Sequence, residues 1–193
     1  GLSKASASQS EAYYGLAMAE SDGISFDTEN YLRSSMLYDK YRSAPDELIE
    51  YLNILYAKEK NPCILEIMSD VSYNVAKRDS DPDIAARHYL AAAMSSYRLL
   101  FSYQGTVDMS CSPIVFRSIR RYNSSVYELF TYLNRRGLVR KESFQLVSAT
   151  GIHVLFTKPV FMLPLPEKNY KSFRACSDYT ISNLSHFTYG FGI

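Results

Sequence analysis

Apolar residues repeat at helical spacing through the middle of the chain. After Asn61, the residues Ile64, Met68, Val71 and Val75 recur at alternating steps of four and three. This spacing places them on one face of a helix, which we predict to run to about residue 77. A face of this kind needs a neighbouring apolar surface to cover it.

The segment before this helix has a matching apolar side. It begins near Pro45 and carries two acidic residues in its first turn, where the helix dipole favours anions. Its apolar stripe consists of Leu48, Tyr51, Leu52 and Leu55. We expect it to pair antiparallel with the helix that follows. Further upstream, Asp27 or Thr28 is expected to cap a helix that runs through about Tyr41.

The segment from Asp83 to Tyr103 predicts a central helix, because it carries two adjacent stripes of mainly apolar residues. The stripes are Ala85, Tyr89, Ala92, Ser96, Leu99, Tyr103 and Ala86, Leu90, Ala93, Tyr97, Leu100. A helix with two such stripes contacts neighbours on two sides. The remaining, wetter surface is expected to hold Arg87, His88, Arg98 and Ser102.

A further long helix is expected after a loop at residues 105–112. Its apolar positions again step by four and three, at Val115, Ile119, Tyr122, Val126, Leu129 and Leu133. Arg135, Arg136 and Gly137 supply the cations and the glycine typical of a helix C-terminus. Three helix starts share one signal, a small polar cap followed by proline: Asn61-Pro62, Asp81-Pro82 and Ser112-Pro113.

The pattern changes to strand-like after Gly137. The β-rich runs 144–147 and 152–156 flank a turn signal at Thr150-Gly151, which predicts a β-hairpin. Three prolines between residues 159 and 166 interrupt regular structure, and residues 170–182 are expected to add an extended piece or a short helix. The tail at 187–193 is typical of a linker.

These elements predict a mainly α fold of stacked antiparallel helical hairpins, similar to a tetratricopeptide superhelix, with a small C-terminal β-hairpin appendage. No clean 34-residue consensus accompanies the repeat. We expect residues 1–10 to be a disordered tether and 11–137 to be the helical-hairpin domain. Residues 138–193 are expected to form a β-containing connector leading towards a missing downstream domain.

Composition adds mainly exclusions. The 21 basic and 20 acidic residues give a net charge of +1, so no overall field attracts nucleic acid or an anionic membrane. No apolar run is long enough to span a bilayer, and no signal peptide begins the chain.

Cys63, Cys111 and Cys176 lie far apart without metal-ligand spacing, although one pair could form a disulfide in an oxidising compartment. Most of the 17 tyrosines are expected in the core or at its boundary.

A search for catalytic motifs gives no candidate. Gly23-Ile24-Ser25 is the nearest approach to a Gly-x-Ser-x-Gly elbow, but it lacks the second glycine and the strand and helix that flank such a serine. His88, His153 and His186 are isolated, which favours structural roles; His153 should share a hairpin face with Leu155 and have no partner. We therefore predict no catalytic, cofactor-binding or metal-ligating residue, and no cofactor.

Two charged clusters admit alternative interpretations. Asp81 and Asp83 could hold a metal, but the helix that starts there favours capping. A basic stretch follows the last predicted helix and its exit: Arg117, Arg120, Arg121, Arg135, Arg136, Arg140 and Lys141. We interpret it as a solvated helix face, and an acidic partner is the alternative.

Three segments together resemble a known family. They are DPDIAARHYLAAAMSSYRLLF from Asp81, YNSSVYELF from Tyr122, and SFRACSDYTISNLSHFTYGFGI from Ser172. In order and composition, residues 45–193 resemble the helical region that precedes the catalytic domain in a group of bacterial α/β-hydrolases of the lipase and esterase kind. HYLAAA and the Tyr-Asn pair are the most specific pieces. Residues 1–44 have no match to it.

The resemblance implies a non-catalytic N-terminal accessory domain of an envelope hydrolase, which positions the catalytic domain or covers its acyl-binding entrance. Its partner would be a downstream hydrolase domain of the same polypeptide or another protein. It implies the cell envelope or secretion as the location, with membrane contact only through a lost N-terminal lipid anchor. The family's catalytic serine, acid and histidine have no counterparts here.

Two other functions remain open. A stand-alone helical-repeat module would bind a protein or peptide in a concave groove of polar and aromatic side chains on the inner helices, away from the tail. An enzyme with an unfamiliar site would have a deep pocket with converging ionisable groups. An apolar patch near the C-terminal end would favour the accessory domain instead.

Overall fold

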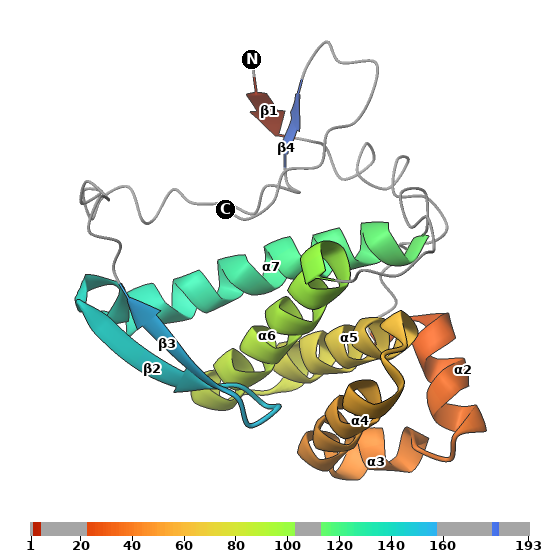
Figure 1. Cartoon of the computed structure of the whole chain (residues 1–193). Helices are drawn as coiled ribbons and strands as arrows, with labels where there is room; N and C mark the ends of the chain where they lie inside the picture. The colour runs from red at the N-terminus through yellow and green to blue at the C-terminus, as the bar shows by residue number, and fades with distance from the viewer. Residues whose placement is uncertain (1, 5–22, 103–112, 158–178, 182–193) are drawn as a thin grey trace.

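The computed structural model describes residues 2–4, 23–102, 113–157 and 179–181, and the statements below concern these residues. In this part of the chain, six helices pack in sequence order and a two-stranded antiparallel hairpin follows them (Figure 1). The helices are α2 (Phe26–Ser34), α3 (Tyr38–Ser43), α4 (Pro45–Glu59), α5 (Pro62–Arg78), α6 (Pro82–Tyr97) and α7 (Pro113–Arg135). The hairpin consists of β2 (Ser143–Val147) and β3 (His153–Thr157). The mainly helical class with a C-terminal hairpin is confirmed.

Proline and a polar cap fix the starts of α5 and α6 as the sequence predicts. The Asn61 side chain accepts a hydrogen bond from the Cys63 amide at 3.0 Å, and Asp81 accepts one from the Asp83 amide at 2.8 Å. Each bond satisfies an amide that has no partner within its helix. Gly137, with φ of 67°, follows α7 and leads into a 3₁₀ turn over Leu138–Arg140.

The single helix expected up to Tyr41 is wrong, because the chain breaks between α2 and α3. Met36 adopts a left-handed φ of 57°. The Leu37 amide donates to the Leu32 carbonyl at 2.7 Å, and the Met36 amide donates to the Arg33 carbonyl at 3.1 Å. This pair of bonds is a Schellman motif, which ends α2 without the glycine that usually marks it. The cap of α2 is Ser25, two residues before the expected Asp27.

The central helix also differs from its prediction near its end. The α-helical part stops at Tyr97, and residues Arg98–Ser102 continue as a π-helix. One face was assigned incorrectly as well: His88, expected on the wetter surface, is 2% exposed. It is covered because α4 brings Asp46 against it, with 3.0 Å between His88 Nε2 and Asp46 Oδ1.

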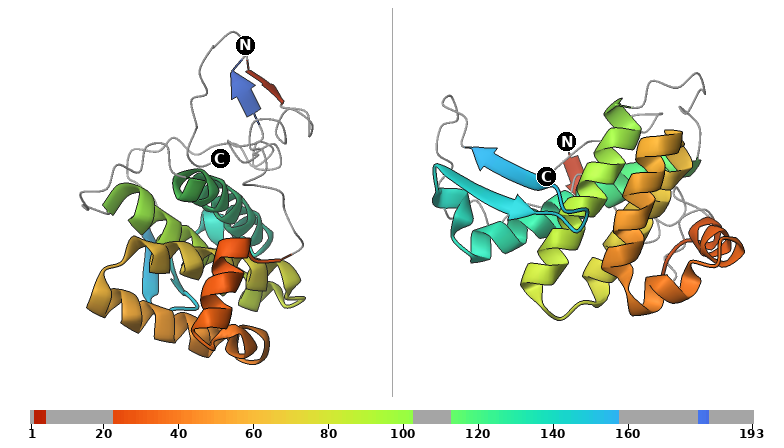
Figure 2. Two further views of the ribbon diagram at one scale, coloured as in Figure 1. Left: turned by 90° about the vertical axis from the view of Figure 1, so that its right-hand side faces the viewer. Right: turned by 60° about the horizontal axis from the view of Figure 1, so that its bottom comes forward.

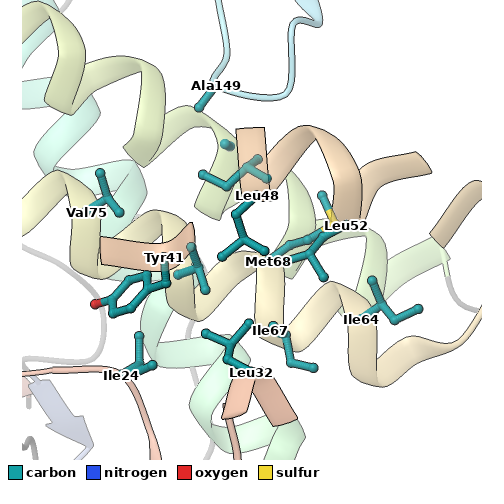
Figure 3. Close-up of a cluster of buried hydrophobic side chains, with 13 residues drawn as sticks. Ile24, Leu32, Tyr41, Leu48, Leu52, Ile64, Ile67, Met68, Val75 and Ala149 are labelled. Atoms are coloured by element: carbon teal, nitrogen blue, oxygen red, sulfur yellow. The ribbon is translucent and has the colours of Figure 1, made fainter. Parts of the chain in front are cut away.

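The first core cluster lies where α2, α3, α4 and α5 meet (Figure 3). Leu32, Leu48, Leu52 and Val71 are fully buried in it. Removing such side chains from water is the main stabilising contribution to the helical stack. Ala149, which comes from the turn of the β-hairpin, reaches the edge of the same cluster (Figure 3).

The second core cluster lies between α6, α7 and the hairpin. Its buried members are Ala86, Leu90, Leu129 and Leu133. The inner face of the hairpin packs against them through Phe144, Leu146, Val154 and Phe156. Figure 2 shows the hairpin along the flank of α6 and α7. The register pairs Phe144 with Phe156 and Val147 with His153. The predicted alternation, which puts His153 on the same face as Leu155 and opposite Val154, is confirmed, and the structure shows that the His153 face is the exposed one.

Two short strands join segments that are far apart in sequence. β1 (Leu2–Lys4) pairs antiparallel with β4 (Tyr179–Ile181), so at these three residues the structure differs from the expected tether. Composition alone does not reveal this backbone pairing between the two ends of the chain. The rest of the expected tether, the loop at 105–112, the prolines at 159–166 and the tail at 187–193 lie outside the described residues.

Candidate functional site: an apolar groove between α6 and α7

Ser25, the serine nearest to a nucleophile motif, acts as a helix cap. Its Oγ accepts from the Thr28 amide at 3.4 Å and bonds the Thr28 hydroxyl at 3.1 Å. Its own amide donates to Asp70 Oδ2 at 2.8 Å. The capping role accounts for its position.

The described histidines occupy different parts of the fold. Burial lowers the pKa of His88, so the imidazole beside Asp46 is neutral at pH 7. Its Nδ1 is buried without a hydrogen-bond partner in the described structure. His153, expected to have no partner, lies on the exposed hairpin face and shares a 2.7 Å contact between its Nδ1 and Gln145 Nε2. His186 lies outside the described residues.

The acidic cluster at the start of α6 serves helix capping and a surface contact. Asp81 caps the helix, while Asp83 accepts hydrogen bonds from Tyr132 of α7 and from Arg136, the residue after α7. The Tyr132 and Arg136 donors lower the pKa of Asp83. Across residues 23–102 and 113–157, no three His, Cys, Asp or Glu side chains gather as a possible metal site. Cys63 is an exposed free thiol.

Part of the basic stretch is buried, which corrects its interpretation as a solvated face. Arg117 and Arg121 both donate to Glu66 Oε1, at 3.1 and 2.9 Å. Arg117 also reaches Asp27 Oδ2 at 2.9 Å. Both arginines turn inward because Glu66 of α5 is only 3% exposed and requires a cation beside it.

A second buried carboxylate completes this ion-pair network. Asp70 Oδ1 contacts Arg121 Nη2 at 2.8 Å and accepts from Asn74 Nδ2 at 3.0 Å, while Oδ2 accepts the Ser25 amide. Two buried carboxylates thus face two arginines, and Glu66 Oε1 and both Asp70 oxygens are occupied. This network fixes α2 and α7 to α5.

A groove of about 430 Å³ between α6 and α7 is the described surface that we take as the candidate binding site. The residues of α6 and of the adjoining π-helix that line it are Leu90, Ala93, Met94, Tyr97 and Arg98. The α7 residues are Tyr122, Val126, Leu129, Phe130 and Leu133. Both sets step by three and four, so each helix turns one continuous face to the groove. Leu90, Ala93, Leu129 and Leu133 are buried and form its floor.

Aromatic rings bound the groove at both ends. At the hairpin end, Phe156 lines it and stacks on Phe144, with ring centroids 4.8 Å apart. At the other end, the Tyr97 ring lies 4.9 Å from Phe101 and 6.2 Å from Tyr122. Tyr97 and Phe101 are each 49% exposed, which is unusual for large rings and leaves apolar area facing solvent.

Polar atoms are few and are confined to the end of the groove at Tyr97, Arg98 and Tyr122. Arg98 is the one charged residue among the side chains that line the groove. Burial raises the pKa of Tyr122, so its hydroxyl keeps its proton at neutral pH. None of the described lining residues is a carboxylate, histidine, serine or cysteine. The predominantly apolar lining is suited to holding an apolar group.

No family model, curated protein or solved structure matches this chain. The resemblance to the helical region of α/β-hydrolases therefore remains a prediction. Within the described part of the chain, no helix combines the length and apolar character that crossing a bilayer requires.

Sequence reasoning found the residues of the groove but gave them another role. Leu90, Ala93 and Tyr97 form one predicted stripe of α6, and Val126, Leu129 and Leu133 belong to the predicted stripe of α7. All were expected to be covered by neighbours. The periodicity identifies the face of a helix but does not show whether another element covers it. Arg98 was assigned to the wetter surface of the predicted helix, so the sequence did not indicate that it lines a groove.

Proposed function

We propose that this chain is a non-catalytic accessory domain of a bacterial envelope hydrolase, and that the groove between α6 and α7 is its binding surface. The observation that carries the proposal is the position of this groove. It is predominantly apolar, and Phe156 of the C-terminal hairpin lines it one residue before β3 ends. The polypeptide leaves the hairpin at that end of the groove.

This position favours an accessory domain over a stand-alone repeat module. The stand-alone module was expected to bind through polar and aromatic side chains on inner helices, away from the tail. The groove is instead mostly aliphatic and aromatic, and it includes the hairpin. The hydrolase identity of the partner rests on the resemblance of residues 45–193 alone.

The first test is to read the open reading frame beyond the codon for Ile193. We expect at least about 200 further residues, a typical domain length, with a Gly-x-Ser-x-Gly elbow. A frame that ends at Ile193 would overturn the hydrolase part of the proposal and favour the stand-alone module.

The second test compares ester hydrolysis by the parent protein and by groove variants. Val126→Glu introduces a charge into the groove, and Leu155→Glu makes the same kind of change on the outward hairpin face, where Leu155 is 66% exposed. We expect Val126→Glu to lower kcat/KM for a p-nitrophenyl acyl ester at least fivefold and Leu155→Glu to leave it within twofold. Residues 1–193 alone should hydrolyse nothing. Hydrolysis by that fragment, or equal activity of the two variants, would contradict the proposal.

A further inference from the structure

Arg98 makes one end of the groove chemically different from the rest. It lies at the first position of the π-helix, next to Tyr97, and faces a surface that is otherwise apolar. Among the described residues, no acidic side chain forms an ion pair with it. A guanidinium has five donors and no acceptor, so in such a place it favours an anionic oxygen ligand. π-Helical turns also occur frequently at functional sites.

The length of the groove suits an extended chain. Its lining residues span Leu90 on α6 to Arg98 at the start of the π-helix, and Tyr122 to Leu133 on α7. At 1.5 Å per residue these spans are about 12 and about 16 Å, which corresponds to on the order of ten methylenes. The volume of about 430 Å³ is in the lower part of the range of small-molecule sites. One alkyl chain suits such a volume better than two.

A peptide fits this lining less well than an alkyl chain does. An extended peptide would bring backbone amides and carbonyls against a surface with almost no hydrogen-bonding groups, which is unfavourable. A helix satisfies its own backbone but measures about 10 Å across with its side chains, too wide for a groove of this volume. An alkyl chain brings no polar group until its end.

We propose that the groove binds a free fatty acid with an alkyl chain of about ten methylenes, with this chain between α6 and α7 and its carboxylate on Arg98. This inference rests on the proposed role of the groove as a binding surface and specifies the class of ligand. Tyr122 lines the groove beside Tyr97, at the same end as Arg98. Charge complementarity at one end and apolar contact along the rest define the recognition.

The test is calorimetric titration of residues 1–193 with dodecanoate below its micelle concentration. We expect one ligand per chain and a Kd about tenfold weaker for Arg98→Gln, because a charge-assisted hydrogen bond is lost. Arg87→Gln is the matched control: it makes the same change in α6, at an exposed residue outside the groove. Its Kd should stay within twofold of the wild-type value.

Two ligand series separate the head group from the chain. The methyl ester of dodecanoate should bind more weakly to the wild type and equally to the wild type and Arg98→Gln, because it carries no charge. From octanoate to dodecanoate, the affinity should rise by up to about fourfold per methylene, as burial of apolar surface requires. Val126→Phe narrows the groove and should weaken dodecanoate binding while the circular dichroism spectrum stays unchanged.

Several results would overturn the inference. Two concern the head group: Arg98→Gln binds dodecanoate as tightly as the wild type does, or the wild type binds the methyl ester as tightly as the acid. Two concern the groove: a folded Val126→Phe binds dodecanoate as tightly as the wild type does, or the wild type does not bind dodecanoate at all. If dodecanoate fails to bind while Val126→Glu still impairs the parent protein, the fatty-acid inference fails and the accessory function stands. If dodecanoate does not bind and Val126→Glu does not impair the parent protein, the groove is not a binding surface.

Discussion

His88 shows how burial changes the behaviour of a single residue. Its imidazole is 2% exposed, and its one described hydrogen-bonding contact is Asp46. Burial lowers its pKa, and the nearby Asp46 carboxylate opposes that shift without reversing it. The folded state therefore binds a proton less readily at this site than the unfolded chain, whose histidines titrate near pH 6.5.

We predict that acidification destabilises the protein through His88. With a depressed folded pKa, the stabilising contribution is present above the unfolded pKa and is lost as the pH falls through the folded pKa. Urea unfolding at pH 7 and pH 5 should show a decrease of up to about 1.4 kcal/mol per pH unit from this group. His88→Gln should remove this component, whereas His153→Gln, at an exposed position, should retain it. An unchanged pH dependence in His88→Gln would contradict the assignment.

At the scale of the element, the end of α2 departs most from local sequence signals. Met36 is in the left-handed region and is 92% exposed, so its side chain contributes little packing while its Cβ strains the backbone. The Schellman bonds from Met36 and Leu37 hold it there. Glycine adopts this conformation without strain but is more flexible in the unfolded chain.

We expect Met36→Gly to stabilise the protein by about 0.5–1 kcal/mol, the relief of strain less the added unfolded-state entropy. Ser35→Gly is the control, because Ser35 has a right-handed φ of −92° and gains nothing from glycine. It should lower the stability. Thermal unfolding of the two variants measures both effects. A loss of stability in Met36→Gly equal to that in Ser35→Gly would show that the turn is unstrained.

The elements that could be predicted are those whose signals are local. α4, α5, α6 and α7 begin at prolines that the sequence marks, and the hairpin strands lie within one residue of their predicted bounds. The break at Met36 could not be predicted, because no glycine marks it. The π-helix after Tyr97 has no local signature either. The residues at the floor of the groove were predicted to be apolar. Whether the groove is left uncovered depends on where the hairpin packs, which the sequence does not show.

At the scale of the whole molecule, the buried ion-pair network joins parts of the chain that are distant in sequence. Arg121 contacts Glu66 across 55 residues and also reaches Asp70, whose other oxygen binds the Ser25 amide. Helical spacing could not reveal these partners. It only gave the arginines positions between the apolar residues of α7, and a solvated face was the simplest interpretation.

Removing Arg121 should destabilise the whole fold. Arg121→Met leaves two buried carboxylates with insufficient positive charge, and we expect a loss of about 3–5 kcal/mol in the free energy of unfolding. The control is Arg136→Met, which breaks the exposed ion pair with Asp83 and should cost less than about 1 kcal/mol. Denaturant unfolding distinguishes the two. Similar small losses would mean that water already solvates the Arg121 network.

The hairpin turn has a mechanical consequence. Ala149 belongs to the first core cluster and its amide donates to the Arg87 carbonyl at 3.1 Å, while the strands beside it pack on the second cluster. Tension applied to the chain beyond Thr157 therefore bears on both clusters at once. A force applied there would have to disrupt the packing of both clusters before the hairpin detached from the helices. The hairpin would therefore transmit force between the helical stack and the chain that follows Thr157.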